Sequence, residues 1–190
     1  MLFRLFLALA LAFSPLVRAD EIWTGTSEVK FRGYSTLHDF DGTVKRVPLK
    51  VTVSPGANGR TVSATSNVEV KDLHTANEKR DANMWTMFQQ AKFRFLKVEV
   101  AGADEAKLHP PDGKPGSMPV ALTIAGRRGT VSAVVTKVVE SPTQGSFDLA
   151  FPVSLKAFNL DPPKSLGGLV KVKDTVDVTV HVVLKKEGAK

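Results

Sequence analysis

The chain of 190 residues contains no cysteine, one tyrosine and two tryptophans. Without cysteine it can form no disulfide, no thiolate nucleophile and no covalent c-type haem attachment, so packing alone must stabilise its fold. The tyrosine and tryptophan content is too low for the aromatic girdles of an outer-membrane barrel, and the charged C-terminal segment 185–190 also argues against one. The composition therefore favours a water-exposed protein whose core is built from aliphatic residues and phenylalanine.

Sequence motifs of common enzymes are also missing. No Gly-x-Ser-x-Gly nucleophile elbow and no glycine-rich phosphate loop occurs. The four histidines, at positions 38, 74, 109 and 181, do not have the spacing of a metal-binding motif. We therefore predict that the protein is not an enzyme, with no catalytic residue, metal site or cofactor.

The N-terminus has the order of features found in secretory signal peptides. Residues 1–4 form a short basic start, residues 5–17 are almost entirely apolar, and Val17-Arg18-Ala19 places small residues at a cleavage site. The apolar run is shorter than the roughly 20 residues of a membrane-spanning helix. We expect residues 1–19 to be a signal peptide and residues 20–190 to be a single exported domain in the periplasm.

The exported part has a modest and dispersed positive charge. Removal of Arg4 and Arg18 with the leader leaves 24 basic and 19 acidic residues, a net charge of +5. No block of five or more like charges occurs, which is typical of solvated strand faces. Transient contact with an anionic membrane surface is compatible with this charge; nucleic acid is not an expected partner. The sequence does not determine the oligomeric state.

Apolar and polar residues alternate with a period of two through nearly the whole exported segment, which indicates β-strands with one buried face. One example is Phe147, Leu149, Phe151 and Val153, which alternate with polar or small residues. We predict an all-β fold, an eight-stranded antiparallel closed barrel, because several strands are long for a sandwich. The eight strands are expected near residues 22–34, 43–54, 60–71, 93–101, 118–125, 129–140, 145–156 and 170–185. A change of phase after Phe95 suggests a bulge near Leu96.

One helix is predicted between the third and fourth strands, over residues 76–89. Thr75 and Glu78 have the spacing of a capping box at its start. Met84, Trp85 and Phe88 would then share an apolar face. This helix either plugs one end of the barrel or acts as a lid over a ligand cavity, and the sequence allows both interpretations.

Four segments, in the same order, resemble the YceI-like family of bacterial proteins. The most specific is Thr75-Ala76-Asn77-Glu78-Lys79-Arg80-Asp81-Ala82 with Met87-Phe88 downstream, which is similar to the Asn-Glu-x-Arg-Asp helix start of that family. The other three are 35–43, Leu122-Thr123-Ile124-Ala125-Gly126, and 158–160 together with 172–176. The resemblance implies a lipocalin-like periplasmic barrel with a helix beside it that carries polyisoprenoid lipids or isoprenoid quinones.

The expected function is therefore that of an exported carrier or storage protein with a long isoprenoid lipid inside the barrel. The alternative is a passive periplasmic interaction or stress-related module with a filled core. The candidate ligand-contacting residues are the large apolar side chains Phe31, Phe40, Met84, Trp85, Phe88, Phe93, Phe95, Leu122, Phe147, Phe151 and Phe158. The candidate polar residues at the mouth are His38, Asp39, Arg80 and Asp81. Each set also has a structural interpretation: the aromatic residues as ordinary core, Arg80 and Asp81 as a pair that fixes the helix, and His38-Asp39 as a turn cap.

Overall fold

The computed structural model describes residues 19–56, 59–110, 113–165 and 169–188. The predicted signal peptide, apart from Ala19, lies outside these residues. Within them, no helix is long and apolar enough to cross a membrane.

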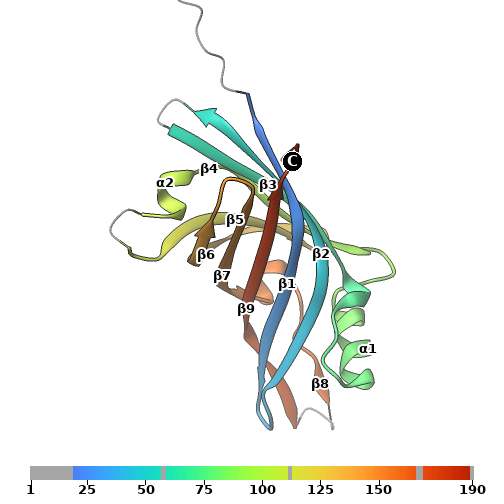
Figure 1. The fold of residues 1–190 in the computed structure, drawn as a ribbon. Helices are drawn as coiled ribbons and strands as arrows, with labels where there is room; N and C mark the ends of the chain where they lie inside the picture. The colour runs from blue at the N-terminus through green and yellow to red at the C-terminus, as the bar shows by residue number, and fades with distance from the viewer. Residues whose placement is uncertain (1–18, 57–58, 111–112, 166–168, 189–190) are drawn as a thin grey trace, which may run out of the picture.

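Eight long strands form a closed antiparallel barrel, as the sequence predicts (Figure 1). Neighbouring strands follow the chain order, and pairing of β9 with β1 closes the barrel. A two-residue strand, β8, pairs with the start of β9 and was not predicted. The bounds are β1 Glu21–Ser35, β2 Phe40–Gly56, β3 Gly59–Glu69, β4 Phe95–Asp104, β5 Gly116–Ile124, β6 Arg127–Glu140, β7 Gln144–Ser154, β8 Lys164–Ser165 and β9 Val170–Lys186.

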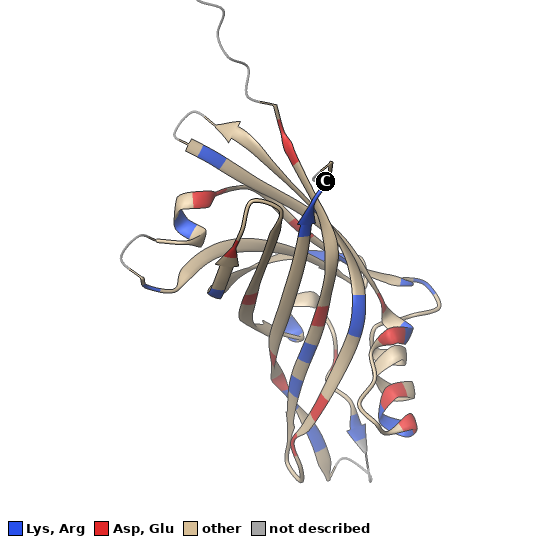
Figure 2. Ribbon diagram, in the orientation of Figure 1, with Lys and Arg blue, Asp and Glu red and all other residues tan. Residues whose placement is uncertain are grey.

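Strands β1, β2 and β9 are the longest, with 15, 17 and 17 residues. They extend past the other strands at the end of the molecule that also carries β8, the lower end in Figure 1. Along β9, side-chain burial alternates at almost every position, with valines inward and charged or polar residues outward. This pattern produces an apolar interior and an outer wall with scattered charges of both signs (Figure 2).

Four register shifts interrupt the regular pairing of the described strands, and two of them coincide with a residue of positive φ. The register of β6 and β7 shifts between Thr136 and Val139, and Lys137 has a positive φ of 51°. This shift lets Val135 and Val138, three residues apart, both face the cavity. The bulge predicted near Leu96 is wrong: Leu96 pairs regularly with Val68, and the irregularity of β4 lies instead around Gly102, which has a φ of 61°. The phase change in the sequence arises because Phe93 precedes the strand.

Helix α1, Glu78–Met87, lies between β3 and β4, as predicted, but it is shorter than expected. Its N-cap is Asn77, whose side chain accepts a hydrogen bond of 2.9 Å from the backbone N–H of Arg80. The predicted capping box between Thr75 and Glu78 is therefore wrong. A second helix of four residues, α2 (Glu105–Leu108), and short 3-10 turns at Val70–Asp72 and Lys156–Phe158 were not predicted.

Helix α1 covers a lateral gap in the barrel wall. Strands β2 and β3 are paired only as far as Lys50 and Thr65, so residues 40–47 of β2 pair with β1 on one side alone. The chain that leads into α1 passes along this free edge, where Thr43 and His74 form an isolated bridge. The helix then lies beside the lower half of β2 (Figure 1). The wall in this region is therefore completed by a helix instead of a strand.

Candidate functional site

The barrel encloses a cavity of about 900 Å³, at the upper end of the 300–1,000 Å³ typical of ligand pockets. Inward side chains of all eight long strands and of α1 form its wall, and most of them are apolar. The cavity excludes the alternative of a core filled by the protein's own side chains.

The interior is hollow because short side chains occupy the inward positions. Val51, Val120 and Val135 are buried in three different strands and all face the cavity, as does Ala64 on β3. Small side chains on opposite walls of an eight-stranded barrel do not meet across the axis. The sequence indicated that the inward positions of the middle strands are mostly valine and alanine, which leaves room inside, but only larger side chains were proposed as ligand contacts.

Nine of the residues proposed from the sequence line this cavity. Arg80 and Met84 come from α1 and Phe88 is its C-cap residue, and the apolar pair Met84 and Phe88 lies at the lateral gap. Both side chains are only 8% exposed. The complete set is Phe31, Phe40, Met84, Phe88, Leu122, Phe147 and Phe151 among the apolar candidates, and His38 and Arg80 among the polar ones.

Four of the proposed aromatic residues lie outside the cavity lining. Trp85 faces the chain before α1, where its Nε1 donates a hydrogen bond of 3.2 Å to the carbonyl of Leu73. Phe95 is 41% exposed, because the phase of β4 turns it outward. The ring of Phe93 instead covers Gly126 in the β5–β6 hairpin, and the ring of Phe158 covers Gly129 near the start of β6.

Asp81 is a buried anchor of α1 and does not line the cavity mouth. Its Oδ1 accepts hydrogen bonds of 2.8 Å from the backbone N–H and 2.6 Å from the hydroxyl of Thr75. His74 Nδ1 lies 3.4 Å from Oδ2 of the same carboxylate. Arg80 does not pair with it: its guanidinium lies over the ring of Phe40, 4.6 Å from the centroid. Asp39, also proposed for the mouth, lies outside the lining, 4.0 Å from Arg32.

One end of the cavity, here called the α1 mouth, is formed by the β1–β2 hairpin, the start of α1 and the β8 region. Its charged and titratable lining residues are basic: His38, Lys79, Arg80 and Lys164. Asn77 on the helix N-cap also contributes to it. The α1 mouth therefore offers hydrogen-bond donors and positive charge around an apolar interior.

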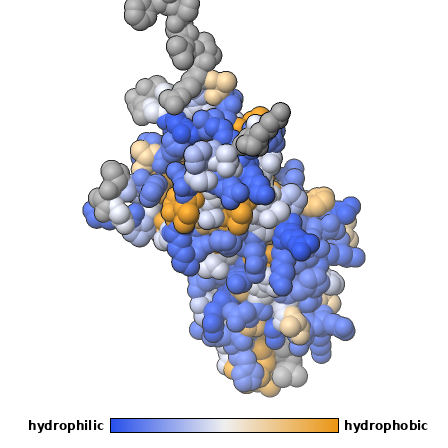
Figure 3. Space-filling model, in the orientation of Figure 1, coloured by the Kyte–Doolittle hydropathy of each residue, from blue (hydrophilic) through white to orange (hydrophobic). Residues whose placement is uncertain are grey.

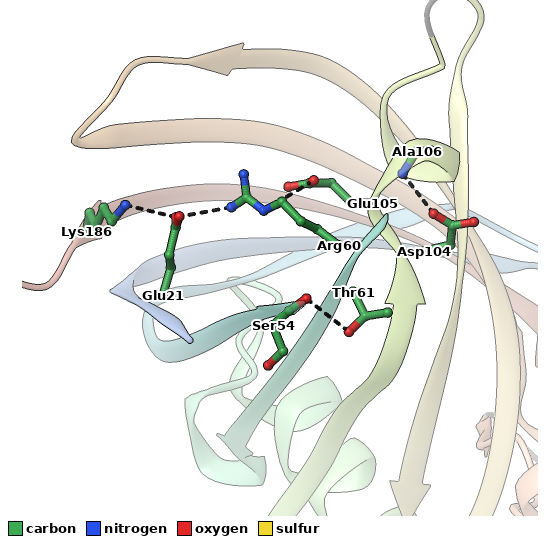
Figure 4. Close-up of polar contacts among 8 residues, drawn as sticks. All are labelled: Glu21, Ser54, Arg60, Thr61, Asp104, Glu105, Ala106 and Lys186. Atoms are coloured by element: carbon green, nitrogen blue, oxygen red, sulfur yellow. Dashed lines mark hydrogen bonds and ion pairs between the residues drawn. The ribbon is translucent and has the colours of Figure 1, made fainter. Parts of the chain in front are cut away.

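The opposite end, here called the ion-paired mouth, is crossed by a chain of ion pairs (Figure 4). Glu21 lies 2.9 Å from Lys186 and 3.1 Å from Arg60, and Arg60 lies 3.5 Å from Glu105. These four residues come from β1, β9, β3 and α2. A hydrogen bond from Lys186 and the nearby charge of Arg60 lower the pKa of Glu21 below its usual value. This series of ion pairs links four elements at this end of the barrel, a relationship that no local sequence pattern indicated.

Among the residues that the structure describes, no three His, Asp or Glu side chains gather in a group that could hold an ion. The charged cavity residues lie mainly at the two mouths, whereas the inward positions between them are almost all apolar. This arrangement is suited to enclosing an apolar molecule.

Solved structures share this fold at low sequence identity. BcnA of Burkholderia cenocepacia is 19% identical, with a TM-score of 0.63, and the match covers 83% of this chain and 95% of that one. A polyisoprenoid-binding domain from Saccharophagus degradans is 15% identical, with a TM-score of 0.60 over 88% of this chain and 98% of that one. A YceI protein of Campylobacter jejuni is 16% identical, with a TM-score of 0.55 over 79% and 86% of the two chains.

None of the curated proteins compared with the chain matches it. The model of the YceI-like domain, however, matches residues 21–184, which include all eight long strands almost completely and both helices. The chain belongs to the YceI-like family.

Proposed function

We propose that the protein is an exported periplasmic carrier or storage protein that binds one long isoprenoid lipid in the barrel and catalyses no reaction. The observation that carries this proposal is an apolar cavity whose lining includes residues at both ends of the barrel, such as Leu37 at the α1 mouth and Lys186 at the ion-paired mouth. The related Saccharophagus domain is described as polyisoprenoid-binding, which supports the same class of ligand.

The length of the cavity favours a long chain. Both Glu21 and Ser35, the two ends of the 15-residue strand β1, contribute to its lining. At about 3.3 Å per residue and a barrel tilt of about 40°, this strand spans roughly 35 Å along the barrel axis. An ordinary fatty acyl chain spans one leaflet, about 15 Å of a hydrocarbon core that is about 30 Å thick. A polyisoprenoid tail can occupy the full length, whereas one acyl chain would fill less than half of it.

Apolar burial supplies enough free energy for binding without a polar anchor. At about 0.8 kcal/mol per buried carbon, a forty-carbon tail gives roughly 30 kcal/mol before costs. Non-covalent affinities do not exceed about 20 kcal/mol, so ordering of the chain must offset part of this sum. The scarcity of charged groups among the described residues in the middle of the wall is then favourable, because few groups there lose their hydration when the lipid binds.

The decisive experiment is organic extraction and native mass spectrometry of the protein purified from its own host. We expect one co-purifying isoprenoid lipid per chain. Ala64→Trp should reduce its retention at least tenfold, because the indole would fill the middle of the cavity. Ala150→Trp is the matched control, since Ala150 is exposed on the outer wall at β7.

Two results would overturn the proposal. One is the absence of any apolar compound from the wild-type protein, and the other is equal retention by Ala64→Trp and the wild type when circular dichroism shows both to be folded. Export is tested separately by fractionation of the host and by sequencing of the mature N-terminus, which we expect to begin at Asp20.

A further inference from the structure

Two exposed leucines lie together on the rim of the α1 mouth. Leu37, in the β1–β2 hairpin, is 60% exposed, and Leu169, just before β9, is 81% exposed. The loops that carry them are tied by Thr36: its hydroxyl donates to the carbonyl of Leu169 at 3.1 Å, and its backbone N–H donates to the carbonyl of Lys171 at 3.1 Å. The two side chains are therefore held on one rim by a hydrogen-bonded frame.

This rim is the protruding end of the molecule. The hairpin and the β8–β9 region form the lower tip in Figure 1, and Figure 3 shows hydrophobic surface at that tip. The rim also surrounds the opening of the cavity, because Leu37, Val170 and Val172 all contribute to the cavity lining. An apolar path thus runs from the exposed tip into the barrel.

Cations flank the leucines. They are located on α1, β8 and β9, and Figure 2 shows blue segments at the lower ends of β8 and β9. The set consists of Lys79, Arg80, Lys164, Lys171 and Lys173.

The acidic residues of the same region offset part of this positive charge. Asp39 and Asp41 lie 4.0 and 3.9 Å from Arg32, and Asp177 accepts a hydrogen bond from the hydroxyl of Tyr34. Glu78 and Asp161 are further exposed carboxylates at this end. Counted with Arg32, six cations stand beside these five carboxylates, and the charged side chains that line the mouth itself, Lys79, Arg80 and Lys164, are all cationic.

We infer that this rim is a docking surface for an anionic phospholipid bilayer, with Leu37 and Leu169 inserted among the acyl chains and the lysines against the phosphates. Exposed aliphatic tips combined with flanking lysines are the chemistry that such an interface selects. The ion-paired mouth lies at the other end of the barrel, so docking by this rim brings the α1 mouth to the membrane. A lipid can then pass between bilayer and cavity without crossing water.

The inference goes beyond the proposed function and is tested apart from it, by sedimentation of the purified protein with vesicles. We expect binding to vesicles that contain phosphatidylglycerol, much weaker binding to phosphatidylcholine alone, and loss of binding at high salt. Leu37→Ser combined with Leu169→Ser should weaken binding at least about tenfold. The matched control is Val139→Ser with Val183→Ser, two valines that are also exposed but lie on the outer wall, and it should bind like the wild type.

Charge is tested in the same way. Lys164→Gln with Lys171→Gln should weaken binding to the anionic vesicles, whereas Lys50→Gln with Lys107→Gln, on the outer wall and on α2, should not. Equal binding by the leucine variant and its control overturns the inference, and this result would leave a protein partner as the occupant of the rim. If the protein binds vesicles but carries no extractable lipid, the result supports docking and contradicts the proposed function. Failure of the docking inference is therefore distinguishable from failure of the proposed function.

Discussion

Phe31 on β1 lies directly opposite Gly42 on β2, and its ring occupies the space in which a side chain at position 42 would begin. The neighbouring pair repeats this relationship in the opposite direction, because the ring of Phe40 on β2 covers Gly33 on β1. Both rings line the cavity near the α1 mouth. The glycines let these rings lie against the strand opposite instead of projecting across the cavity.

Gly42→Ala should therefore narrow the cavity. A methyl group at position 42 would overlap the ring of Phe31, which lines the cavity, so the ring must move. We expect a loss of stability of about 1–3 kcal/mol, as for other overpacked sites. Urea unfolding measures the loss of stability, and lipid retention reports the narrowing of the cavity. In the double variant with Phe31→Ala, the methyl group at position 42 meets no ring. The effects of the two substitutions on stability should therefore be strongly non-additive. Additive effects would show that the ring does not oppose position 42.

Phe88→Asp should abolish retention of the lipid. Phe88 faces the cavity from the end of α1 and is 8% exposed, so the substitution places a carboxylate in an apolar wall. Native mass spectrometry gives the occupancy. Phe95→Asp is the control, because Phe95 is 41% exposed and lies outside the lining. Phe88→Leu, which remains apolar, should keep the lipid; unchanged retention by Phe88→Asp would contradict the role of α1 as part of the cavity wall.

Asp81→Ala should loosen the start of α1. The substitution leaves the buried N–H and hydroxyl of Thr75 without their acceptor, and we expect a loss of about 1–3 kcal/mol in the free energy of unfolding. Asp72→Ala, at an exposed position in the preceding turn, should change stability by less than about 0.5 kcal/mol. Chemical denaturation of both variants measures the difference, and similar values for the two would contradict an anchoring role.

The sequence predicted the barrel well because strand periodicity is a local signal. Inward and outward positions of β9 alternate from Val170 to Lys185, and each such strand identifies its own inward face. Aromatic character was a poorer guide to the cavity, since Phe93, Phe95 and Phe158 have the same side chain as Phe31 but different strand phases or neighbours. The position of Phe95 could be read only once the start of β4 was known.

Relationships between distant residues were not predictable in the same way. Asp81 was proposed as a mouth residue or, alternatively, as a partner of its neighbour Arg80, but in the folded chain it accepts a hydrogen bond from the hydroxyl of Thr75, and Phe40 lies against Arg80. The chain of ion pairs through Arg60 joins residues from four elements. Long-range side-chain pairs depend on strand register and on loop geometry, neither of which has a periodic signature.

The ion-paired mouth should make stability depend on pH through Glu21. Its pKa in the folded protein is lowered, first by the hydrogen bond from Lys186 and then by the charge of Arg60, while the unfolded chain has the ordinary value of about 4.3. A lowered folded pKa stabilises the protein above the unfolded value, and this contribution is lost as the pH falls through the folded value. Since Glu21 is partly exposed, we expect a contribution of at most about 1 kcal/mol at neutral pH.

Urea unfolding of the wild type and Glu21→Gln over a range of pH measures this contribution. The difference in stability should be greatest at neutral pH, should shrink below pH of about 4.3 and should be reduced by salt. Glu140→Gln, which removes an exposed carboxylate at the same end, should show a smaller difference at neutral pH. Lys186→Gln should raise the pKa of Glu21 in a carboxyl NMR titration, because it removes the largest cause of the shift. An unchanged titration of Glu21 in that variant would mean that Lys186 does not hold the carboxylate in solution.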